Sequence, residues 1–396
     1  MDKLFTSLGL MSGTSLDGID ASILSSDGEN IIDIKRNIFK PYDSKFRKNL
    51  EAYIANINSL EDIKKSQTEY DKLEEELTRR HVKLSRQIIS DFGKVDLVGF
   101  HGQTIVHRPK EKYSIQMGDA KLMSKLLKTK VIYNFRKSDI KNNGTGAPLT
   151  PIYHYNLSKK INIPEPNIFL NIGGIANITY INNNIMEATD IGPGNVWMDE
   201  YMKKIGLETK RKGKYMGLKI SYDTGGGLAE SGFPQIDIVK YFVREQHTKV
   251  FAKGRRVING KFKCSLNRGD YSDVSFAEGF GDSSGMATLT YATAQIISEY
   301  LGTIKDLENL ILCGGGRKND TLIKYIKNMI FKDSPVTGLS NIKIKKIDEY
   351  GIDGDFVESQ AFAYLAIRSY LKLPISFSET TGCIKPCTGG VIVKNY

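Results

Sequence analysis

Cysteine is scarce in this sequence. Only four of the 396 residues are cysteines, and Cys383 and Cys387, in "TTGCIKPCTGG", are the only two that lie close together. A zinc site normally requires four ligands, and the five histidines do not cluster near this pair. We therefore expect Cys383 and Cys387 to be two reduced thiols of a cytoplasmic protein rather than a metal site.

Long apolar runs are also missing. No stretch approaches eighteen consecutive apolar residues, so we predict no transmembrane helix. The first residues, "MDKLFTSLGLMSGT", contain too short an apolar stretch for a secretory signal. Both absences favour a cytoplasmic location.

Acidic residues are fewer than basic ones. Asp and Glu number 45 against 56 Lys and Arg, which gives a formal net charge of +11. Such an excess can indicate nucleic-acid binding, but the lysines are scattered, and no compact arginine-rich tract or aromatic RNA-binding signature is present. We therefore expect a solvated lysine-rich surface that mildly attracts anionic small substrates, and no nucleic-acid partner.

Strand-like and helix-like segments alternate along the chain, which indicates an α/β fold with mixed sheets. Residues 59–92 have the apolar spacing of one long amphipathic helix or two shorter ones, and "VDLVGFHGQTIVHRP" resembles a buried strand followed by a polar turn. Residues 207–276 are less patterned, and we interpret them as loops and short elements.

The chain starts its second half much as it starts its first. A strand, a glycine turn and a second strand open the sequence, and "NIFLNIGGIANITYINNN" repeats that pattern after the Gly/Pro-rich connection "KNNGTGAPLTPIYH". This repetition suggests an internal structural duplication. We predict a first domain of residues 1–146 plus 356–396 and a second domain of residues 147–355.

Four glycine-rich turns follow strands: "MSGTSLDG", "NIGGIANIT", "DIGPGN" and "CGGGRKND". None is a Walker A loop, because none ends in Gly-Lys-Ser/Thr. Phosphates need backbone N–H donors at close approach, which glycine permits, so four such turns together indicate a nucleotide site. In the first turn Thr14 and Ser15 add hydroxyl donors, while Asp17 and Asp20 could hold Mg²⁺, mostly through water. A plain hairpin turn remains compatible with the same residues.

Motifs along nearly the whole chain resemble one family. In chain order they are "GLMSGTSLDGIDA", "GFHGQTIVHRP", "NFRKSD…GAPLTP", "NIGGIANIT", "DIGPGN…MDEY", "CGGGRKND" and "VESQAFAYLA". Together they resemble the anhydro-N-acetylmuramic acid kinases, which belong to the actin, sugar kinase and Hsp70 superfamily. The resemblance is weakest over residues 207–287.

The resemblance implies an activity and an architecture. Members of this family use ATP and Mg²⁺ to phosphorylate the 6-oxygen of 1,6-anhydro-N-acetylmuramic acid, and water opens the anhydro ring in the same reaction. The product, N-acetylmuramic acid 6-phosphate, is an intermediate in recycling the cell wall. The implied fold is a two-domain, actin-like α/β fold with a cleft that closes around ATP and the sugar; members are often homodimers.

The resemblance also assigns roles to residues. It assigns to Asp190 the role of the general base, which takes a proton from water. The nucleotide-binding candidates are Gly13, Thr14, Ser15, Leu16, Asp17, Gly18, Ile19, Asp20, Gly173, Gly174, Gly192, Gly194, Gly314, Gly315, Gly316 and Glu358. The sugar-binding candidates are His101, Gln103, Thr104, Arg136, Asp139, Asn195 and Asp199, with Arg136 paired to the lactyl carboxylate and Asp139 orienting the site.

Structural interpretations compete with several of these roles. Asp190 could cap a turn, His101 could cap a strand, and Asn195 and Asp199 could cap a helix. Glu358 could be an ordinary exposed helix residue.

The sequence also departs from the family pattern. Ile191 replaces the usual Thr after the candidate base, and Asn143 and Thr145 replace Gly and Gln before "GAPL". The family's "PPKSTGRE" has no counterpart, and its "DGxxAxxG" survives only partly in "DTGGGLAESG". Two alternatives therefore stay open: a kinase for another anhydrosugar such as levoglucosan, which Arg136 disfavours because a neutral sugar has no carboxylate, and a non-catalytic nucleotide-binding homologue.

Overall fold

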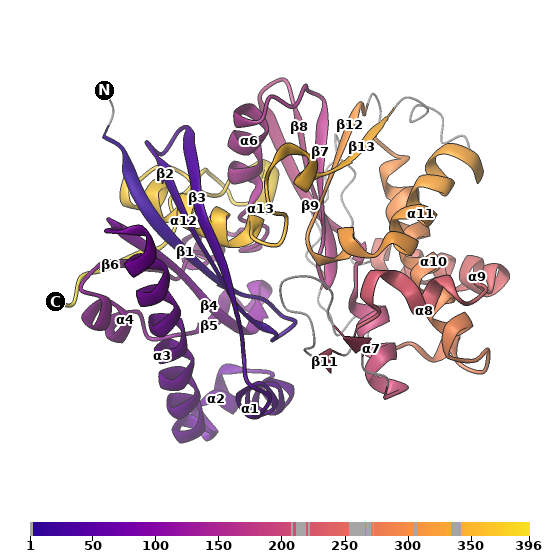
Figure 1. The fold of residues 1–396 in the computed structure, drawn as a ribbon, viewed down its shortest axis with the longest axis horizontal. Coiled ribbons are helices and arrows are strands. Elements are labelled where there is room, and N and C mark those ends of the chain that lie inside the picture. The colour runs from indigo at the N-terminus through magenta and orange to yellow at the C-terminus, as the bar shows by residue number, and fades with distance from the viewer. Residues whose placement is uncertain are drawn as a thin grey trace. The chain divides into compact units, whose positions relative to one another are not determined.

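Two compact units make up the chain in the computed structural model (Figure 1). Unit 1 comprises Met1–Asn162 and Asp355–Tyr396, and unit 2 comprises Ile163–Gly354. The structure describes residues 3–206, 209–210, 219–220, 222–252, 266, 271, 273–304, 307–333 and 342–396.

Unit 1 is built around a seven-stranded sheet in the order β14-β6-β4-β1-β2-β3, with β5 paired to β4. The strands are β1 (Phe5–Ser12), β2 (Gly18–Ser26), β3 (Ile31–Pro41), β4 (Leu97–Arg108), β5 (Tyr113–Met117), β6 (Lys130–Tyr133) and β14 (Val391–Val393). The helices are α1 (Ser44–Ala55), α2 (Leu60–Lys65), α3 (Gln67–Phe92), α4 (Ala120–Leu127), α5 (Lys137–Lys141), α6 (Pro151–Lys160), α12 (Val357–Tyr370) and α13 (Ser378–Thr381). The amphipathic segment 59–92 thus forms one short and one long helix.

Unit 2 contains a five-stranded sheet in the order β13-β12-β7-β8-β9 and a two-stranded sheet of β10 (Thr209–Lys210) and β11 (Lys219–Ile220). The larger sheet comprises β7 (Asn167–Ile172), β8 (Ile175–Asn182), β9 (Ile185–Pro193), β12 (Asn309–Cys313) and β13 (Lys343–Lys346). The helices are α7 (Val196–Lys204), α8 (Gly227–Glu230), α9 (Ile236–Ala252), α10 (Asp282–Leu301) and α11 (Asp320–Asn328).

Both units have the same strand topology. In unit 1 an antiparallel meander, β3-β2-β1, continues into the parallel strands β4 and β6; in unit 2 the meander β9-β8-β7 continues into the parallel strands β12 and β13. This repeated topology confirms the expected structural duplication and the mixed α/β fold. Because β1 and β4 are parallel neighbours, as are β7 and β12, their carboxyl ends meet at one edge of each sheet.

Two expectations from the sequence need correction. Residues 147–162 belong to unit 1 rather than to the second domain, because α6 packs on α12: Tyr153 donates a hydrogen bond to Gln360 (2.8 Å), and Asn156 donates one to the Tyr364 hydroxyl (2.8 Å). Within 207–276 the helix α9 spans 17 residues, so this region is not only loops and short elements. The stretch 253–265 and several smaller parts of 207–276 lie outside the described residues.

Helix α12 lies directly on the main chain of the unit 1 sheet. Gly9 of β1 and Gly99 of β4 are register partners. A Cβ at Gly9 would lie 2.0 Å from the Ser359 carbonyl oxygen, and a Cβ at Gly99 would lie 2.2 Å from the Phe362 carbonyl oxygen. The two glycines therefore remove the side chains that would hold α12 away from the strands.

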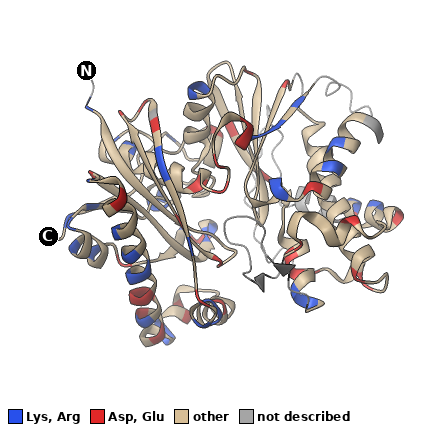
Figure 2. Ribbon diagram, in the orientation of Figure 1, with Lys and Arg blue, Asp and Glu red and all other residues tan. Residues whose placement is uncertain are grey.

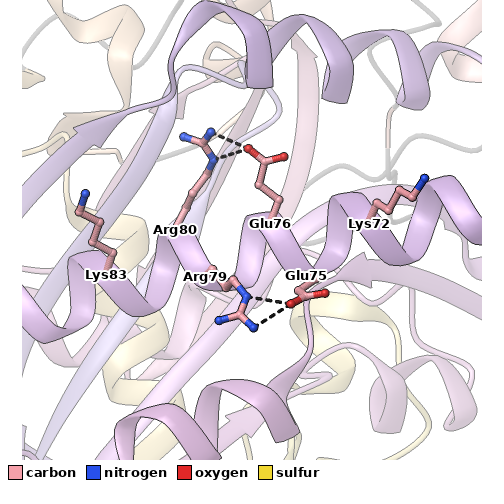
Figure 3. A pocket seen from close by; sticks show the side chains of 6 residues that line it. All are labelled: Lys72, Glu75, Glu76, Arg79, Arg80 and Lys83. Atoms are coloured by element: carbon pink, nitrogen blue, oxygen red, sulfur yellow. Dashed lines mark hydrogen bonds and ion pairs between the residues drawn. The ribbon is translucent and has the colours of Figure 1, made fainter.

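Charged residues of both signs are interspersed in the described part of the chain (Figure 2). Helix α3 shows this most clearly, because Arg79 pairs with Glu75 (2.8 Å) and Arg80 with Glu76 (2.6 Å) one turn away (Figure 3). A hollow on this helix is lined by Lys72, Glu75, Glu76, Arg79, Arg80 and Lys83. Its paired charges are typical of a solvated helix surface. Among the described helices, none is long and apolar enough to cross a membrane.

Candidate active site

The first glycine turn joins β1 to β2 in unit 1. Leu16 is buried, its φ is 54°, and its N–H donates to the Gly13 carbonyl oxygen (3.2 Å). Thr14 and Ser15 at the tip are exposed, and the Ser15 hydroxyl donates to the Asp17 carboxylate (2.8 Å). The segment is therefore a hairpin turn held by an apolar anchor, with its hydroxyls and the partly exposed Asp17 at the surface.

The rest of this turn leads into the sheet. Gly18, Ile19 and Asp20 begin β2, where Asp20 is opposite Met11 of β1 and Phe39 of β3. Ile19 is buried in the core, whereas Asp20 is partly exposed. Strand geometry places these two side chains on opposite faces of the sheet.

A buried polar network attaches the turn to β4. The Ser12 hydroxyl donates to Gln103 Oε1 (2.7 Å) and lies 2.9 Å from the Tyr42 hydroxyl, while Gln103 Nε2 donates to the Gly13 carbonyl oxygen (3.3 Å). The Tyr42 N–H donates to the Asp17 carbonyl oxygen (3.0 Å). Gln103 is 1% exposed, so in this structure its amide positions the turn. Sequence reasoning missed Ser12 and Tyr42, although Ser12 directly precedes the turn.

The "HGQT" motif lies inside β4 rather than in a turn after it. The strand continues to Arg108, and the bend is supplied by Gly102, whose φ is 75° and whose Cβ would lie 2.4 Å from the Met117 carbonyl oxygen. Thr104 is partly exposed, and its hydroxyl oxygen accepts from Gln116 (3.3 Å).

The buried His101 pairs with the partly exposed Arg136 in unit 1. Arg136 NH2 donates to His101 Nε2 (2.9 Å), and His101 Nδ1 lies 2.8 Å from the Gly102 carbonyl oxygen. Burial is the main cause, and the positive charge of Arg136 the second, that holds the pKa of His101 well below its ordinary value. The ring is therefore neutral, with its proton on Nδ1, and it fixes the orientation of the guanidinium.

The loop after α5 is held from both sides. Arg136 NH1 donates to the Gly146 carbonyl oxygen (2.7 Å), and the Gly146 N–H donates to Asp139 Oδ2 (2.6 Å). Asp139 is 1% exposed. His107 lies against this loop as well: burial lowers its pKa to about 4, with the charge of Arg136 acting in the same direction. The sequence signal for His107 was its place in the motif "GFHGQTIVHRP".

Two glycine turns of unit 2 are hydrogen-bonded to each other. The N–H groups of Gly194 and Val196 donate to the Gly174 carbonyl oxygen (2.9 and 3.2 Å), and that of Asn195 donates to the Gly173 carbonyl oxygen (2.7 Å). A Cβ at Gly194 would lie 2.2 Å from the Gly173 carbonyl oxygen, so only glycine allows this approach.

The third glycine turn of unit 2 follows β12 and joins the same cluster. A Cβ at Gly314 would lie 2.4 Å from Asn171 Oδ1, and a Cβ at Gly316 would lie 2.8 Å from Asn195 Oδ1; Gly315 lies between them. Arg317 is 1% exposed and donates from NH1 to the Gly314 carbonyl oxygen (3.0 Å), which holds this turn. Its guanidinium also forms an ion pair with two hydrogen bonds. The three glycine turns of unit 2 therefore meet at the carboxyl edge of its sheet.

The ion pair of Arg317 is with Asp348. The two bonds are 2.6 and 2.8 Å long. Burial alone would raise the pKa of Asp348, but the Arg317 guanidinium outweighs it and the pKa is lowered. This pair braces the turn and is not among the residues expected from the sequence.

Asp190 lies at a β-bulge near the end of β9. Asn177 of β8 is opposite Asp190, whereas the preceding Ala176 is opposite Gly192, so Ile191 is the extra residue. The Asp190 carboxylate is partly exposed and accepts from the Leu266 N–H (2.8 Å). Ile191 is 1% exposed in the core of unit 2, so this departure from the family pattern changes core packing.

Asn195 and Asp199 lie at the start of α7. Asn195 occupies the cap position, but its side chain makes no capping bond and instead donates to the Ile172 carbonyl oxygen (3.3 Å). Asp199 is in the first helical turn and partly exposed. Asn195 therefore ties the "DIGPGN" turn to the end of β7.

The turn at Thr224–Gly226 is a further part of this cluster that sequence reasoning missed. Thr321 donates from its hydroxyl to the Gly226 carbonyl oxygen (2.8 Å), and Asp223 accepts from the N–H groups of Leu228 (2.8 Å) and Ala229 (3.0 Å). The only signal was the incomplete motif "DTGGGLAESG". The Asp223 carboxylate thus satisfies two main-chain donors in the first turn of α8, whose cap position is Gly226.

Glu358 lies in the first turn of α12 in unit 1 and is partly exposed. The next residue, Ser359, is buried, and its hydroxyl lies 2.6 Å from that of Ser22 in β2. The position of Glu358 suits the positive end of the helix dipole, so an ordinary helical role and a ligand role remain compatible.

Comparisons with known proteins identify the family. A family model described as "Anhydro-N-acetylmuramic acid kinase" matches residues 5–395. An anhydro-N-acetylmuramic acid kinase of Pelagibacter ubique (strain HTCC1062) is 43% identical over 405 residues, covering 100% of both chains, and one of Rhizobium etli is 34% identical over 399 residues, covering 99% of both. Among solved structures, a ROK family glucokinase from Streptomyces griseus in complex with glucose and AMPPNP matches at 12% identity and a TM-score of 0.34, covering 91% of this chain and 99% of that one. The family model and the full-length relatives show that the chain belongs to the anhydro-N-acetylmuramic acid kinase family.

Proposed function

We propose that this protein transfers the γ-phosphoryl group of ATP to O6 of 1,6-anhydro-N-acetylmuramic acid while water opens the anhydro ring. The product is N-acetylmuramic acid 6-phosphate, and the cellular role is cytoplasmic recycling of the cell wall. Family membership over the full chain supports the kinase activity. The observation that carries the proposal within the structure is the position of Asp190 at the bulge directly before the Gly192–Gly194 turn.

Asp190 acts as the general base in this proposal. It takes a proton from water as the water oxygen forms a bond to C1 of the sugar. The C1–O6 bond breaks, and O6 forms the bond to the γ-phosphorus while ADP leaves. The hydrogen bond from the Leu266 N–H holds the carboxylate in one orientation, as a general base requires.

The glycine turns are suited to the phosphates of ATP. At Gly194, Gly314 and Gly316 a Cβ would collide with neighbouring atoms, so these tightly packed turns require glycine, whereas Gly315 is exposed. In unit 1 the exposed Thr14 and Ser15 would donate to phosphate oxygens. Glu358 belongs to the same set of nucleotide candidates in this proposal.

Asp17 and Asp20 are the residues that would hold Mg²⁺. Both carboxylates are partly exposed, and carboxylate and water oxygens are the donors that this ion prefers. Bound Mg²⁺ would neutralise phosphate charge during the transfer.

Arg136 is the candidate partner for the lactyl carboxylate of the sugar. The neutral His101 ring and the Gly146 carbonyl oxygen hold its guanidinium in a fixed orientation, which suits pairing with a carboxylate. Thr104, Asn195 and Asp199 are the remaining candidates for sugar contacts. Gln103 and Asp139 support the site indirectly, through the first glycine turn and the Gly146 loop.

The test is a coupled ADP-release assay with Mg·ATP and 1,6-anhydro-N-acetylmuramic acid. We expect turnover by the parent protein and a fall in kcat of about 10²- to 10⁴-fold in Asp190→Asn, because a general base contributes on that order. Glu187→Gln, a change of the same kind in the same strand, is the matched control and should retain activity. Turnover of levoglucosan alone, or ATP binding without turnover of either sugar, would refute the proposal, and equal activity of parent and Asp190→Asn would show that the base is misassigned.

A further inference from the structure

The C-terminal loop of unit 1 brings both close cysteines to a carboxylate. The thiol sulfurs of Cys383 and Cys387 and a carboxylate oxygen of Asp139 lie within 4.8 Å of one another. Cys383 and Asp139 are each 1% exposed, and Cys387 is partly exposed. Cys383 and Cys387 lie close together in the sequence, whereas the fold brings the third ligand, Asp139, from more than two hundred residues away.

This loop is held on both sides by the main chain. The Ile384 N–H donates to the Asn142 carbonyl oxygen (2.9 Å), and Thr145 donates to the Thr381 carbonyl oxygen (2.9 Å). On the other side Cys387 forms an isolated antiparallel bridge with Ser376. The three candidate ligands therefore come from segments fixed in position, as a preformed site requires.

We propose that Asp139, Cys383 and Cys387 form a site for a thiophilic divalent cation of the Zn²⁺ class. Two thiolates and one carboxylate are a donor set that suits Zn²⁺ better than Mg²⁺. Ligand atoms around tetrahedral Zn²⁺ lie roughly 3.8 Å apart at a zinc–sulfur distance of about 2.3 Å. Atoms within 4.8 Å of one another reach that spacing through small side-chain movements. Water completes the fourth position.

The site holds protons until a cation replaces them. Binding of the cation forms two metal–sulfur bonds and one metal–oxygen bond and releases both thiol protons to solvent. The Asp139 carboxylate already accepts from the Gly146 N–H (2.6 Å) and from the Thr381 hydroxyl (2.5 Å), and its about four lone-pair positions leave room for a cation beside both.

Cobalt(II) is the probe, because cobalt–thiolate bonds absorb strongly in the near ultraviolet and Co²⁺ replaces Zn²⁺ in tetrahedral sites. Reduced, untagged full-length protein is titrated under nitrogen without ATP or sugar, and Zn²⁺ is then added to displace the cobalt. We expect one equivalent of Co²⁺ to bind and Zn²⁺ to abolish the absorption. Because no kinase reaction is measured, failure of the proposed function would leave this result unchanged, and the reverse holds as well.

Variants test whether the named thiols carry the signal. Cys387→Ser and Cys383→Ser should each weaken binding by more than the about 10- to 100-fold that loss of an outer-shell partner costs. Cys313→Ala, which removes a buried thiol of unit 2, should bind cobalt as the parent does. Circular dichroism identifies any variant that fails to fold, and the other cysteine variant then decides. The proposal is overturned if no saturable absorption develops, or if the folded Cys383 and Cys387 variants bind cobalt as tightly as the parent.

Discussion

Mild acid should destabilise unit 1 through its buried histidines. Burial lowers the pKa of His81 to about 4, of His107 to about 4 and of His154 to about 3, and it holds the pKa of His101 well below its ordinary value. In the unfolded chain each of these histidines has an ordinary pKa of about 6.5. The unfolded chain therefore binds protons first, and the stabilisation that is fully present above pH 6.5 is lost as the pH falls toward the folded-state values.

The size of the effect follows from the linkage between proton binding and folding. At pH 5, about 1.5 units below the unfolded pKa, each neutral histidine lowers the free energy of unfolding by about 2 kcal/mol, at 1.36 kcal/mol per unit. His81, His107 and His154 together account for about 6 kcal/mol, which is comparable to the total stability of about 5–15 kcal/mol of many domains. His101 acts in the same direction.

Urea unfolding followed by circular dichroism at pH 7, 6 and 5 measures this loss. His81→Met removes one titrating ring whose Nδ1 lies 2.9 Å from the Leu77 carbonyl oxygen. The variant should be less stable at pH 7 but should lose about 2 kcal/mol less than the parent between pH 7 and pH 5. Lys83→Met, an exposed position on the same helix, should follow the parent. A parent stability that is flat between pH 7 and 5, or an unchanged pH dependence in His81→Met, would refute the reasoning.

Two further predictions concern packing and the first glycine turn. Gly9→Val should lower the free energy of unfolding by more than the about 1–3 kcal/mol typical of overpacking, because the new Cβ meets the Ser359 main chain. The control Gly227→Ala, where a Cβ meets nothing within 4 Å, should be near neutral. Equal melting temperatures of the two variants would contradict this prediction. Gln103→Leu should raise the KM for ATP several-fold in steady-state assays. The first glycine turn loses the hydrogen bonds that Gln103 makes with the Ser12 hydroxyl and the Gly13 carbonyl oxygen, each worth about 1 kcal/mol. An unchanged KM in a folded variant would show that Gln103 does not position this turn.

Local sequence patterns predicted the repeated strand and glycine-turn units. Alternating apolar residues and glycines are short-range signals, so the two hairpins and the mixed sheets follow from the amino-acid order alone. The resemblance also assigned Asp190 as the candidate base, and its position just before a glycine turn could be read from the contiguous motif "DIGPGN". Ile191 shows the limit of such motifs: only the bulge reveals that its side chain packs in the core.

Contacts between distant segments could not be predicted in the same way. Gln103 of β4 meets Ser12 of β1 through the register of the sheet, whereas Arg136, just before α5, meets His101 through tertiary packing; neither partner follows from spacing in the sequence. The assignment of residues 147–162 was also missed, because a Gly/Pro-rich connection resembles a linker, whereas Tyr153 fastens the following helix to α12.

The mutual attachment of the glycine turns in unit 2 affects the entropy of ligand binding. Gly173 and Gly174 accept main-chain bonds from Gly194, Asn195 and Val196 before any ligand arrives. A loop that is ordered only on binding loses conformational freedom at that moment, and the loss reduces affinity. Here that loss has already occurred during folding. The association of a polyphosphate with this part of the site should therefore show a small entropic penalty and little change in the exchange of these amide hydrogens.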